Sequence, residues 1–340
     1  MQLSAFDYHL PRHLIAQKPV EPRDSSKLMV IRDDQIEHKT FRDLAGYLSE
    51  EDVLVLNDSK VLPARLLGMK ETGGKVELLL IGREDGNSRE CMIRGKNIRK
   101  DTRLIFAEQR LEAIVREKKE GGRYKIEFLS EYRVDEIIQE IGKMPTPPYI
   151  KEPLEKPERY QTVYAKENGS IAAPTAGLHF TEHFLGELKI KGIEVVRITL
   201  HVSTGTFLPV KTDDIRMHRM EKEYFKVDGN AARKIKLAKD NGNKIFAVGT
   251  TTVKALESAC DDSGEIFEGE GQSDLFIYPG YEFKSDLDGI LTNFHLPKST
   301  LLMLVSAFAG KDTILNAYKV AMESSYRFYS FGDAMLILKG

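Results

Sequence analysis

The sequence predicts an α/β protein: a discontinuous α/β domain built from both chain ends, with a small antiparallel β-barrel domain inserted between them. Two observations predict this arrangement. Residues 53–129 form short segments rich in branched residues, and Gly, Asn, Asp and Lys clusters separate them at spacings of about 8–12 residues, as in small barrels. After residue 150, helical and strand-like patterns alternate, which is typical of an α/β layer.

The central region is predicted to contain short strands followed by one helix. Helical spacing appears at Val134–Ile141, and the proline-rich Met144–Ile150 then stops regular structure, because proline lacks an amide donor and restricts its predecessor. These signals place the α/β domain at 1–58 and 148–340 and the inserted domain at 59–147. The expected strands are 53–56, 64–68, 75–82, 91–95, 103–106, 110–117 and 124–129.

The second half is predicted to alternate helices and strands. Gly192 ends a helix, a Gly/Thr turn at Gly249 follows a strand, and Pro279 closes another strand. The expected helices are 184–190, 231–238, 250–259, 301–309 and 313–322, and the expected strands are 193–202, 244–248, 274–278 and 334–338.

The bulk composition indicates a soluble globular protein. Of 340 residues, 41% are hydrophobic and 30% charged, which is typical of chains with a sizeable core. The longest apolar run, Leu301–Ala309, is about half the roughly 20 residues that a membrane span needs. The N-terminus lacks the apolar core of a secretory signal, and Cys91 and Cys260 lie far apart, so a reducing cytoplasm is expected.

Charge is distributed unevenly along the chain. The net charge is −2, yet Lys60–Lys125 holds 17 Lys and Arg against 10 Asp and Glu, whereas the remainder holds 33 against 42. Such an asymmetry is consistent with a module that faces a polyanion, and equally with a solvated surface.

Two segments have a composition that a purely structural element does not need. Gln161–Phe180 and Ile198–Phe207 combine Gly, Thr and His, and Gly and His lie close together in both. Glycine lets the backbone approach a ligand, and histidine titrates near neutral pH. We therefore expect a site at these segments.

The turn at Gly249–Thr252 has two explanations. Amide groups at a helix start can bind an anion, and strand ends in α/β sheets line ligand clefts. An ordinary threonine cap explains the same residues, and the turn lacks the lysine of a P-loop and the further glycines of a dinucleotide fingerprint. Both interpretations stay open.

His179 and His183 match the HxxEH pattern of some zinc peptidases. Thr181 is a natural N-cap, so the helix is expected to begin after His179 and to carry only His183. The two imidazoles would then not share a helical face, and we expect a chance match rather than a metal site.

Two later segments are also ambiguous. Thr292–Thr300 is a polar loop before an apolar helix that Ser299 or Thr300 should cap, and Asn293 and His295 have no evident structural task there, which favours a site role. Tyr326–Asp333 groups aromatic residues around one arginine. Aromatic rings beside an arginine could stack on a nucleobase. Packing in the core together with one ion pair is the simpler explanation of the same residues.

Together these segments resemble the S-adenosylmethionine:tRNA ribosyltransferase-isomerase family, and the likeness extends over the whole chain. The motifs that carry it are Phe6–Val30, Leu56–Gly68, Pro147–Ile150, Glu158–Thr181, Leu200–Val210, Val248–Ser258, Phe276–Phe283, Leu291–Gly310 and Tyr326–Leu336. The resemblance implies transfer and isomerisation of the ribosyl group of S-adenosylmethionine onto 7-aminomethyl-7-deazaguanine at the tRNA wobble position. Epoxyqueuosine-tRNA, adenine and methionine would be the products. It also implies S-adenosylmethionine as co-substrate, tRNA as partner and no metal. The basic inserted domain is the candidate contact to tRNA, and we expect a monomer in the cytoplasm.

The resemblance also implies roles for individual residues. The reaction needs a base beside the sulfonium and an acid for the leaving adenine; the candidate proton carriers are His179, His201, Glu223 and His295. The candidate contacts to S-adenosylmethionine are Thr175, Gly177, Phe180, Gly205, Thr206, Gly249, Thr250 and Asn293. The candidate contacts to tRNA or its base are Arg65, Arg99, Lys100, Tyr326, Arg327, Phe328 and Asp333.

The chain departs from the family pattern at several positions. Glu221 stands where the family has a second histidine in HxMHxE, Ser203 replaces a glycine, and Lys254 replaces an arginine. These departures keep two alternatives open: a protein of the same fold that uses a different acceptor, and a tRNA-binding protein with reduced catalysis.

Overall fold

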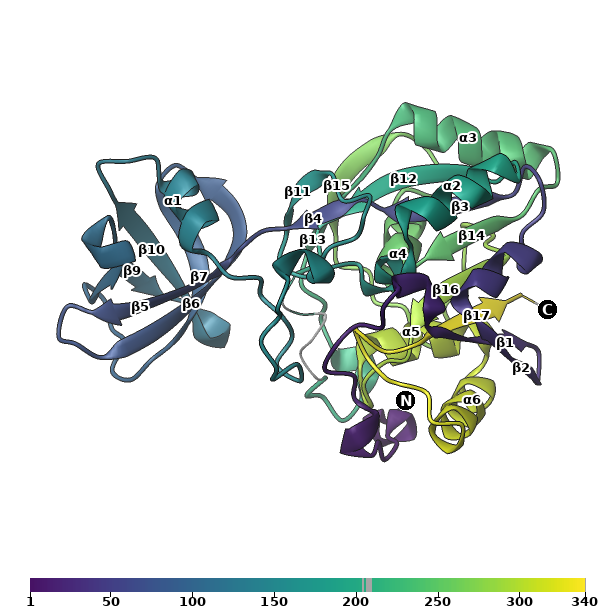
Figure 1. Cartoon of the computed structure of the whole chain (residues 1–340), viewed down its shortest axis with the longest axis horizontal. Helices are drawn as coiled ribbons and strands as arrows, with labels where there is room; N and C mark the ends of the chain where they lie inside the picture. The colour runs from purple at the N-terminus through teal and green to yellow at the C-terminus, as the bar shows by residue number, and fades with distance from the viewer. Residues whose placement is uncertain (204, 206–209, 340) are drawn as a thin grey trace. The chain divides into compact units, whose positions relative to one another are not determined.

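The computed structural model of the chain describes residues 1–203, 205 and 210–339, and only the backbone of 82–85. Tertiary contacts divide it into two compact units. Unit 1 comprises Met1–Ser59, Pro148–Glu167 and Ala173–Gly340, and unit 2 comprises Lys60–Pro147 and Asn168–Ala172 (Figure 1). The structure mixes helices with large sheets, so the predicted α/β class is confirmed.

Within the described part of unit 1, nine strands form one sheet in the order β15-β13-β12-β3-β14-β16-β17-β1-β2. Four neighbours, β12, β3, β14 and β16, run parallel to one another. Their carboxyl ends therefore lie at one edge of the sheet. The strands are β1 (Lys27–Arg32), β2 (Gln35–Thr40), β3 (Val53–Asn57), β12 (Glu194–Leu200), β13 (Glu223–Val227), β14 (Ile245–Val248), β15 (Gly269–Ser273), β16 (Gly289–Asn293) and β17 (Ala334–Leu338).

Five α-helices and several short 3-10 turns accompany this sheet among the described residues. The helices are α2 (Glu182–Ile190), α3 (Gly229–Asp240), α4 (Thr250–Ser258), α5 (Thr300–Ala309) and α6 (Lys311–Glu323). The 3-10 turns are η1 (Leu3–Phe6), η2 (Arg12–Leu14), η3 (Arg23–Ser25), η4 (Phe41–Tyr47), η7 (Pro157–Tyr160), η8 (Thr175–His179) and η10 (Ile215–Met217).

The predicted helix caps are present. The Thr181 side chain accepts a hydrogen bond from the Phe184 amide (3.0 Å), and the Ser299 side chain accepts one from the Leu302 amide (3.2 Å). Each cap pairs an amide that the helix itself leaves unpaired, which explains where α2 and α5 begin.

One face of the sheet packs against η4, η8 and α2. Leu54 and Leu56 of β3 point to this face, because side chains two residues apart in a strand share a side. They meet Phe41, Phe180 and Phe184, whose rings contact one another with centroids 4.9–6.1 Å apart. This aromatic cluster fastens the turn at Thr175–His179 onto the sheet.

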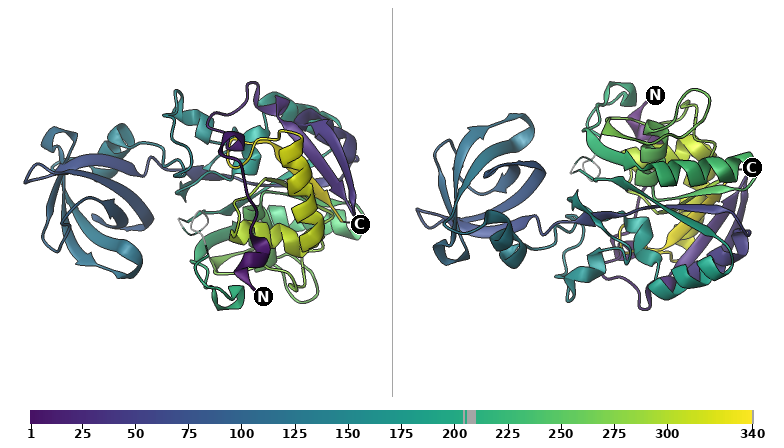
Figure 2. Two further views of the ribbon diagram at one scale, coloured as in Figure 1. Left: turned by 90° about the horizontal axis from the view of Figure 1, so that it is seen from below. Right: turned by 90° about the horizontal axis from the view of Figure 1, so that it is seen from above.

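Unit 2 contains six antiparallel strands in a sheet that closes on itself, because β9 pairs with β10 (Figures 1 and 2). Alternate side chains of these strands are buried in the apolar cluster that they surround, and α1 (Val134–Ile141) packs against it. The strands are β5 (Arg65–Lys70), β6 (Lys75–Asp85), β7 (Ser88–Arg94), β8 (Arg103–Phe106), β9 (Leu111–Lys118) and β10 (Arg123–Leu129), with η5 (Ala107–Gln109) and η6 (Glu120–Gly122) between them. Residues Asn168–Ala172, which were expected in the α/β domain, group with this unit because β11 (Glu167–Ser170) pairs with β4 (Ser59–Val61).

Two sequence expectations in unit 1 were wrong. The strand expected at Asp274–Tyr278 lies instead at Gly269–Ser273, a segment without branched residues, because its backbone pairs with β13 from Gly269 to Ser273. Thr292 and Asn293, expected in a loop, close strand β16. In both places hydrogen-bonded partners outweigh local residue preference.

Truncation of Phe41 should test the central aromatic cluster. Phe41→Ala removes a fully buried ring and is expected to lower the free energy of unfolding by about 3–5 kcal/mol, measured by urea titration. Ile190→Ala is the control, because this side chain is 89% exposed and its loss should change the free energy by less than about 0.5 kcal/mol. Equal effects of the two substitutions would contradict the assignment of the core.

Candidate functional site

The carboxyl ends of the four parallel strands bring distant motifs together. β12 ends at Leu200, β3 at Asn57, β14 at Val248 and β16 at Asn293. Ligands of open α/β sheets bind beyond such strand ends. The residues that follow these ends are therefore the first candidates for a site.

Asn57 joins three of the segments at this edge. Its side-chain oxygen accepts from the Leu200 amide (3.0 Å), and its side-chain nitrogen donates to the Leu200 carbonyl (3.0 Å) and to the Thr251 hydroxyl (3.1 Å). The side chain is fully buried. Asn57 thus fixes the end of β12 and the start of α4 relative to β3.

His201 is the first residue beyond β12. Its Nδ1 lies 2.7 Å from the Ser59 hydroxyl, and its ring stacks on Tyr224 with centroids 5.4 Å apart. The side chain is half-buried. It therefore combines a fixed orientation with partial access to solvent.

His179 belongs to a buried polar chain. Its Nε2 lies 3.1 Å from the Asn293 side-chain nitrogen, and the Asn293 oxygen accepts from the Thr175 hydroxyl (2.9 Å). Because the Asn293 nitrogen is a donor, Nε2 of His179 is the acceptor, and its Nδ1 carries the proton and donates to the Ser26 hydroxyl (2.7 Å). These contacts select one tautomer of the imidazole.

His295 occupies a separate environment. Its Nε2 lies 3.1 Å from the Thr292 hydroxyl, and its amide donates to the Tyr318 hydroxyl (2.8 Å). Thr292 and Asn293 are consecutive in β16, so their side chains leave opposite faces of the sheet. His295 and His179 therefore do not converge on one point.

Both of these histidines are neutral at physiological pH. Burial, followed by the positive charges of Arg327 and Arg23, lowers the pKa of His179 to about 3. Burial also lowers the pKa of His295 to about 3. Neither imidazolium forms readily, because burial penalises the charged form.

Glu223 is held in a buried ion pair. Its Oε2 lies 2.6 Å from Lys254 Nζ, and its Oε1 accepts from the Ser203 amide (2.8 Å) and hydroxyl (3.2 Å). Nearby, Glu221 Oε2 accepts from the Gly205 amide (3.1 Å). Both carboxylates therefore contact the segment that follows β12.

The predicted S-adenosylmethionine contacts lie in unlike surroundings. Thr175 is half-buried and bonded to Asn293, whereas Phe180 is fully enclosed by the aromatic cluster, so a ligand could stack on it only if neighbouring rings moved. A Cβ at Gly177 would lie 2.0 Å from the Tyr164 hydroxyl, so tight packing on Tyr164 explains this glycine. Thr206 lies outside the described residues.

The turn before α4 needs its glycine for backbone reasons. Gly249 has φ +88°, which is costly for any residue with a Cβ, and its amide donates to the Leu291 carbonyl (2.7 Å). Thr250 begins α4 and is buried. The first turn of this helix therefore faces the same edge as Asn57.

The aromatic segment near the C-terminus forms a braced turn. Asp333 accepts from the amides of Lys27 (3.1 Å) and Arg327 (2.8 Å), and it lies 3.3 Å from the Arg327 guanidinium. Tyr326 and Phe328 are buried, and the Tyr326 hydroxyl lies 2.9 Å from His38 Nδ1. The segment is therefore packed in the core and held by one ion pair, as the simpler explanation predicted.

The predicted basic residues of unit 2 differ in exposure. Arg65 donates to the Thr146 carbonyl (2.9 Å) and lies 3.4 Å from Glu77, so it is part of the internal structure of the unit. Arg99 and Lys100 are exposed in the turn after β7. Only the latter two are placed to meet a large partner without rearrangement.

The HxxEH pattern does not assemble. His179 is buried in η8, whereas His183 lies in α2 with a 73% exposed side chain, 3.1 Å from Glu187. Within the ranges that the structure describes, no group of three or more His, Cys, Asp or Glu residues is arranged to hold a metal ion.

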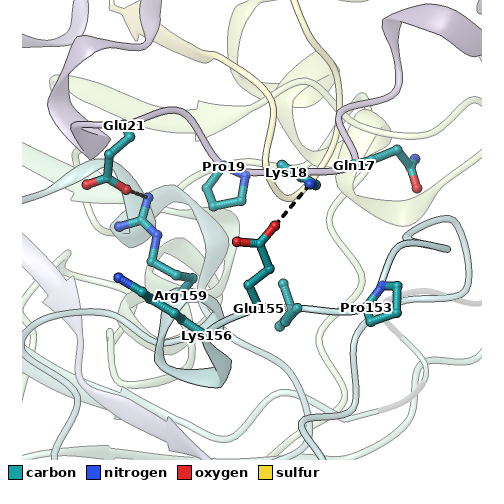
Figure 3. Close-up of a pocket in the computed structure, with 9 residues that line it drawn as sticks. Gln17, Lys18, Pro19, Glu21, Pro153, Glu155, Lys156 and Arg159 are labelled. Carbon is teal, nitrogen blue, oxygen red and sulfur yellow. Dashed lines mark hydrogen bonds and ion pairs between the residues drawn. The ribbon is translucent and has the colours of Figure 1, made fainter.

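A cavity of about 200 Å³ lies elsewhere on unit 1, between residues 17–21 and 153–159 (Figure 3). Charges of both signs line it: Lys18 lies 3.2 Å from Glu155, and Arg159 lies 2.9 Å from Glu21. None of the predicted site residues lines this cavity, although Arg327 donates to the Lys18 carbonyl (3.3 Å) at its rim. The strand-end edge therefore remains the better candidate.

Sequence reasoning missed several residues that organise this edge. Asn57 directly follows the apolar run of β3, and Ser59 lies two residues further along. Polar residues at the end of a buried strand were the signal that could have identified them. Ser26 carries no such signal, and Lys254 was noted only as a departure from the family pattern, because the partners of both residues are distant in sequence.

Known proteins are similar to this chain over almost its full length. A family model described as Queuosine biosynthesis protein matches residues 3–337. Three relatives named S-adenosylmethionine:tRNA ribosyltransferase-isomerase, from Carboxydothermus hydrogenoformans, Symbiobacterium thermophilum and Desulforamulus reducens, are 51%, 52% and 49% identical to this chain. Each alignment covers 99% of this chain and 100% of the relative.

A solved structure is also similar to this chain. The crystal structure of an S-adenosylmethionine tRNA ribosyltransferase from Thermotoga maritima is 40% identical, covers 98% of this chain and 100% of its own, and has a TM-score of 0.56. Because the family model matches residues 3–337 and the three relatives align with 99% of the chain, the chain belongs to the queuosine biosynthesis protein family.

Proposed function

We propose that the chain transfers the ribosyl group of S-adenosylmethionine to 7-aminomethyl-7-deazaguanine at the wobble position of tRNA and isomerises it to epoxyqueuosine, releasing adenine and methionine. One observation carries the proposal: four of the segments that resemble the family, which begin at Leu56, Leu200, Val248 and Leu291, lie at the carboxyl ends of the parallel strands β3, β12, β14 and β16. S-adenosylmethionine is a substrate in this reaction, and no metal takes part.

The proposed S-adenosylmethionine site is this edge of the sheet. The half-buried hydroxyl of Thr175 and the start of α4 offer hydrogen-bonding groups for the ribose and the amino-acid end, and amide groups at a helix start favour a carboxylate. The proposed contacts are Thr175, Gly205, Thr206, Gly249, Thr250 and Asn293. Gly177 and Phe180, which were also expected to touch the ligand, are packed against buried aromatic side chains, so we assign them a supporting role.

His201 is the proposed principal proton carrier. A proton carrier must reach the substrate and change its charge near the working pH. The half-buried position of His201 and its bond to Ser59 support this role. His179 and His295 are neutral and enclosed, so we assign them orienting roles: His179 holds Asn293, and His295 holds Thr292.

Unit 2 is the proposed tRNA-contacting domain, a small antiparallel β-barrel inserted in the α/β domain. The excess of positive charge in Lys60–Lys125 and the exposure of Arg99 and Lys100 support it. Arg65 supports the unit internally. We propose that Tyr326, Arg327, Phe328 and Asp333 shape the place for the target base as one braced turn.

We further propose a monomer that works in the cytoplasm. Cys91 and Cys260 are buried thiols, in keeping with a reducing compartment. Over the described residues, no helix combines the length and apolar character needed to cross a bilayer.

The reaction itself is the first test. Incubation with S-adenosylmethionine and tRNA that carries 7-aminomethyl-7-deazaguanine should release adenine and leave epoxyqueuosine in the digested tRNA. His201→Ala should lower kcat by about 100-fold or more while the melting temperature stays close to that of the unmodified chain, because an acid–base group is lost. His183→Ala, a change at an exposed histidine, is the control.

The alternatives give different results. Adenine released without tRNA would favour a different acceptor. Salt-sensitive tRNA binding with neither product would favour a tRNA-binding protein with reduced catalysis. Near-normal turnover of His201→Ala would remove His201 from the proton carriers.

The buried histidines should make stability depend on pH. Their pKa is about 3 in the folded chain and near 6.5 in the unfolded chain, so the unfolded state binds more protons between these values. Stability is therefore full above about pH 6.5, and each histidine removes roughly 1 kcal/mol per pH unit as the pH falls.

Urea unfolding at about pH 7.5 and about pH 5.5 measures this dependence. His295→Gln should show a smaller loss between the two pH values than the unmodified chain, whereas His183→Gln at an exposed site should show the same loss. An unchanged loss in His295→Gln would mean that this imidazole is not buried in its neutral form.

Charge reversal tests the role of unit 2. Arg99→Glu combined with Lys100→Glu should weaken tRNA binding and reduce the slope of log Kd against log salt by about two, because two phosphate contacts are lost. The control is Lys189→Glu with Lys319→Glu, which reverses two exposed charges on α2 and α6. A slope equal to that of the control pair would contradict the assignment.

A further inference from the structure

The pairing between β12 and β13 opens just beyond the last strand residue. Thr199 pairs with Lys226 and Leu200 with Phe225, and the His201 amide continues this ladder by donating to the Tyr224 carbonyl (2.9 Å). The next alternate amides, those of Ser203 and Gly205, bond instead to the side chains of Glu223 and Glu221. A carboxylate takes the place of a backbone carbonyl at both positions.

The spacing of the two carboxylates explains this pattern. Glu221 and Glu223 are two residues apart at the start of β13, and both carboxylates reach the segment that follows β12. Ser203 and Gly205 are also two residues apart, and their amides meet the carboxylates in order, at 2.8 and 3.1 Å. The Ser203 and Gly205 backbone therefore does not pair directly with the backbone at the start of β13. A glutamate side chain lies between the two segments at each position.

Gly205 allows the Glu221 carboxylate to approach the backbone closely. A Cβ at this position would lie 3.1–3.2 Å from the Glu221 side chain, tighter than ordinary packing. Glycine at 205 and glutamate at 221 therefore fit each other sterically, as well as through the hydrogen bond.

The Glu223 carboxylate forms an ion pair with a lysine of α4. Lys254 Nζ lies 2.6 Å from Glu223, and the two side chains are 5% and 1% exposed. A buried charge must be balanced by an opposite charge in contact with it. The chain of contacts Ser203–Glu223–Lys254 thus couples the segment after β12 to the helix that begins at Thr250.

We propose that Glu221, Glu223 and Lys254 are positioning residues that hold the backbone of Ser203 and Gly205 apart from β13 and so shape the S-adenosylmethionine site. This inference rests on the proposed function. It gives Glu223 a role through the backbone of Ser203 rather than as a proton carrier. It also gives a task to Glu221 and Lys254, two departures from the family pattern.

Glu221→Ala is the first test, read by amide hydrogen exchange of the 201–205 segment and by steady-state kinetics. Exchange of the Gly205 amide should become about tenfold faster, because its acceptor is gone. KM for S-adenosylmethionine should rise about tenfold while kcat stays within about threefold, as expected for a group that shapes the binding site. Unfolding monitored in parallel should show a folded variant.

The ion pair is tested by two variants. Lys254→Arg keeps the charge and should retain nearly normal KM and exchange. Lys254→Met combined with Glu223→Gln removes both charges, leaves neither uncompensated, and should raise KM and accelerate exchange of the Ser203 amide. Lys236→Met is the control, since Lys236 of α3 forms an exposed ion pair with Glu265 whose loss should change neither quantity.

Two results would overturn the proposal. Exchange of the Gly205 amide at the unmodified rate in Glu221→Ala would show that the carboxylate does not hold this backbone. A fall in kcat of about 100-fold or more, with KM and exchange unchanged, would assign Glu221 to the chemistry instead. Failure of the proposed function would give a different result. The chain without substitutions would release no adenine, while the variants would still show the expected changes in amide exchange.

Discussion

The parallel pairing of β12 and β14 with β3 is the constraint on which the site depends. Parallel strands place all of their carboxyl ends at one edge, so residues 57, 200 and 248 become neighbours although more than 40 residues separate them in the chain. Asn57 reinforces this edge, because its amide pairs with both backbone groups of Leu200 and with Thr251 where the ladder of β3 ends. A buried amide that is fully paired is rigid, since each lost partner would leave a polar group unsatisfied.

Many of the motif residues lie behind the proposed site rather than in it. His179 joins Ser26 to Asn293, Asp333 binds two amides and Arg327, and Glu223 binds Ser203 and Lys254. Polar groups are costly to bury, and these are paired on more than one atom. Such contacts fix the backbone of the segments that meet at this edge of the sheet. A family pattern therefore includes supporting residues as well as residues that touch the substrate.

Much of the fold was predictable because local patterns were strong. Helix Val134–Ile141 and strand Ala334–Leu338 occur at the expected residues, and Thr181 and Ser299 cap their helices. The strand at Gly269–Ser273 was missed, because its residues have low strand preference and only pairing with β13 makes it extended. The same limit applies to the site: histidine and glycine could be recognised as candidates, but their burial and partners could not.

The sequence by itself determined the α/β class, the capped starts of α2 and α5 and, through its ordered motifs, the family. These depend on periodicity, caps and residue identity, which are local properties of the chain. Only the tertiary structure decided that His179 and His295 bond to opposite faces of β16, that Phe180 lies in the core, and that Lys254 meets Glu223. The reason is physical: burial, charge pairing and the lowered pKa of a histidine are set by neighbours that folding brings from distant parts of the chain.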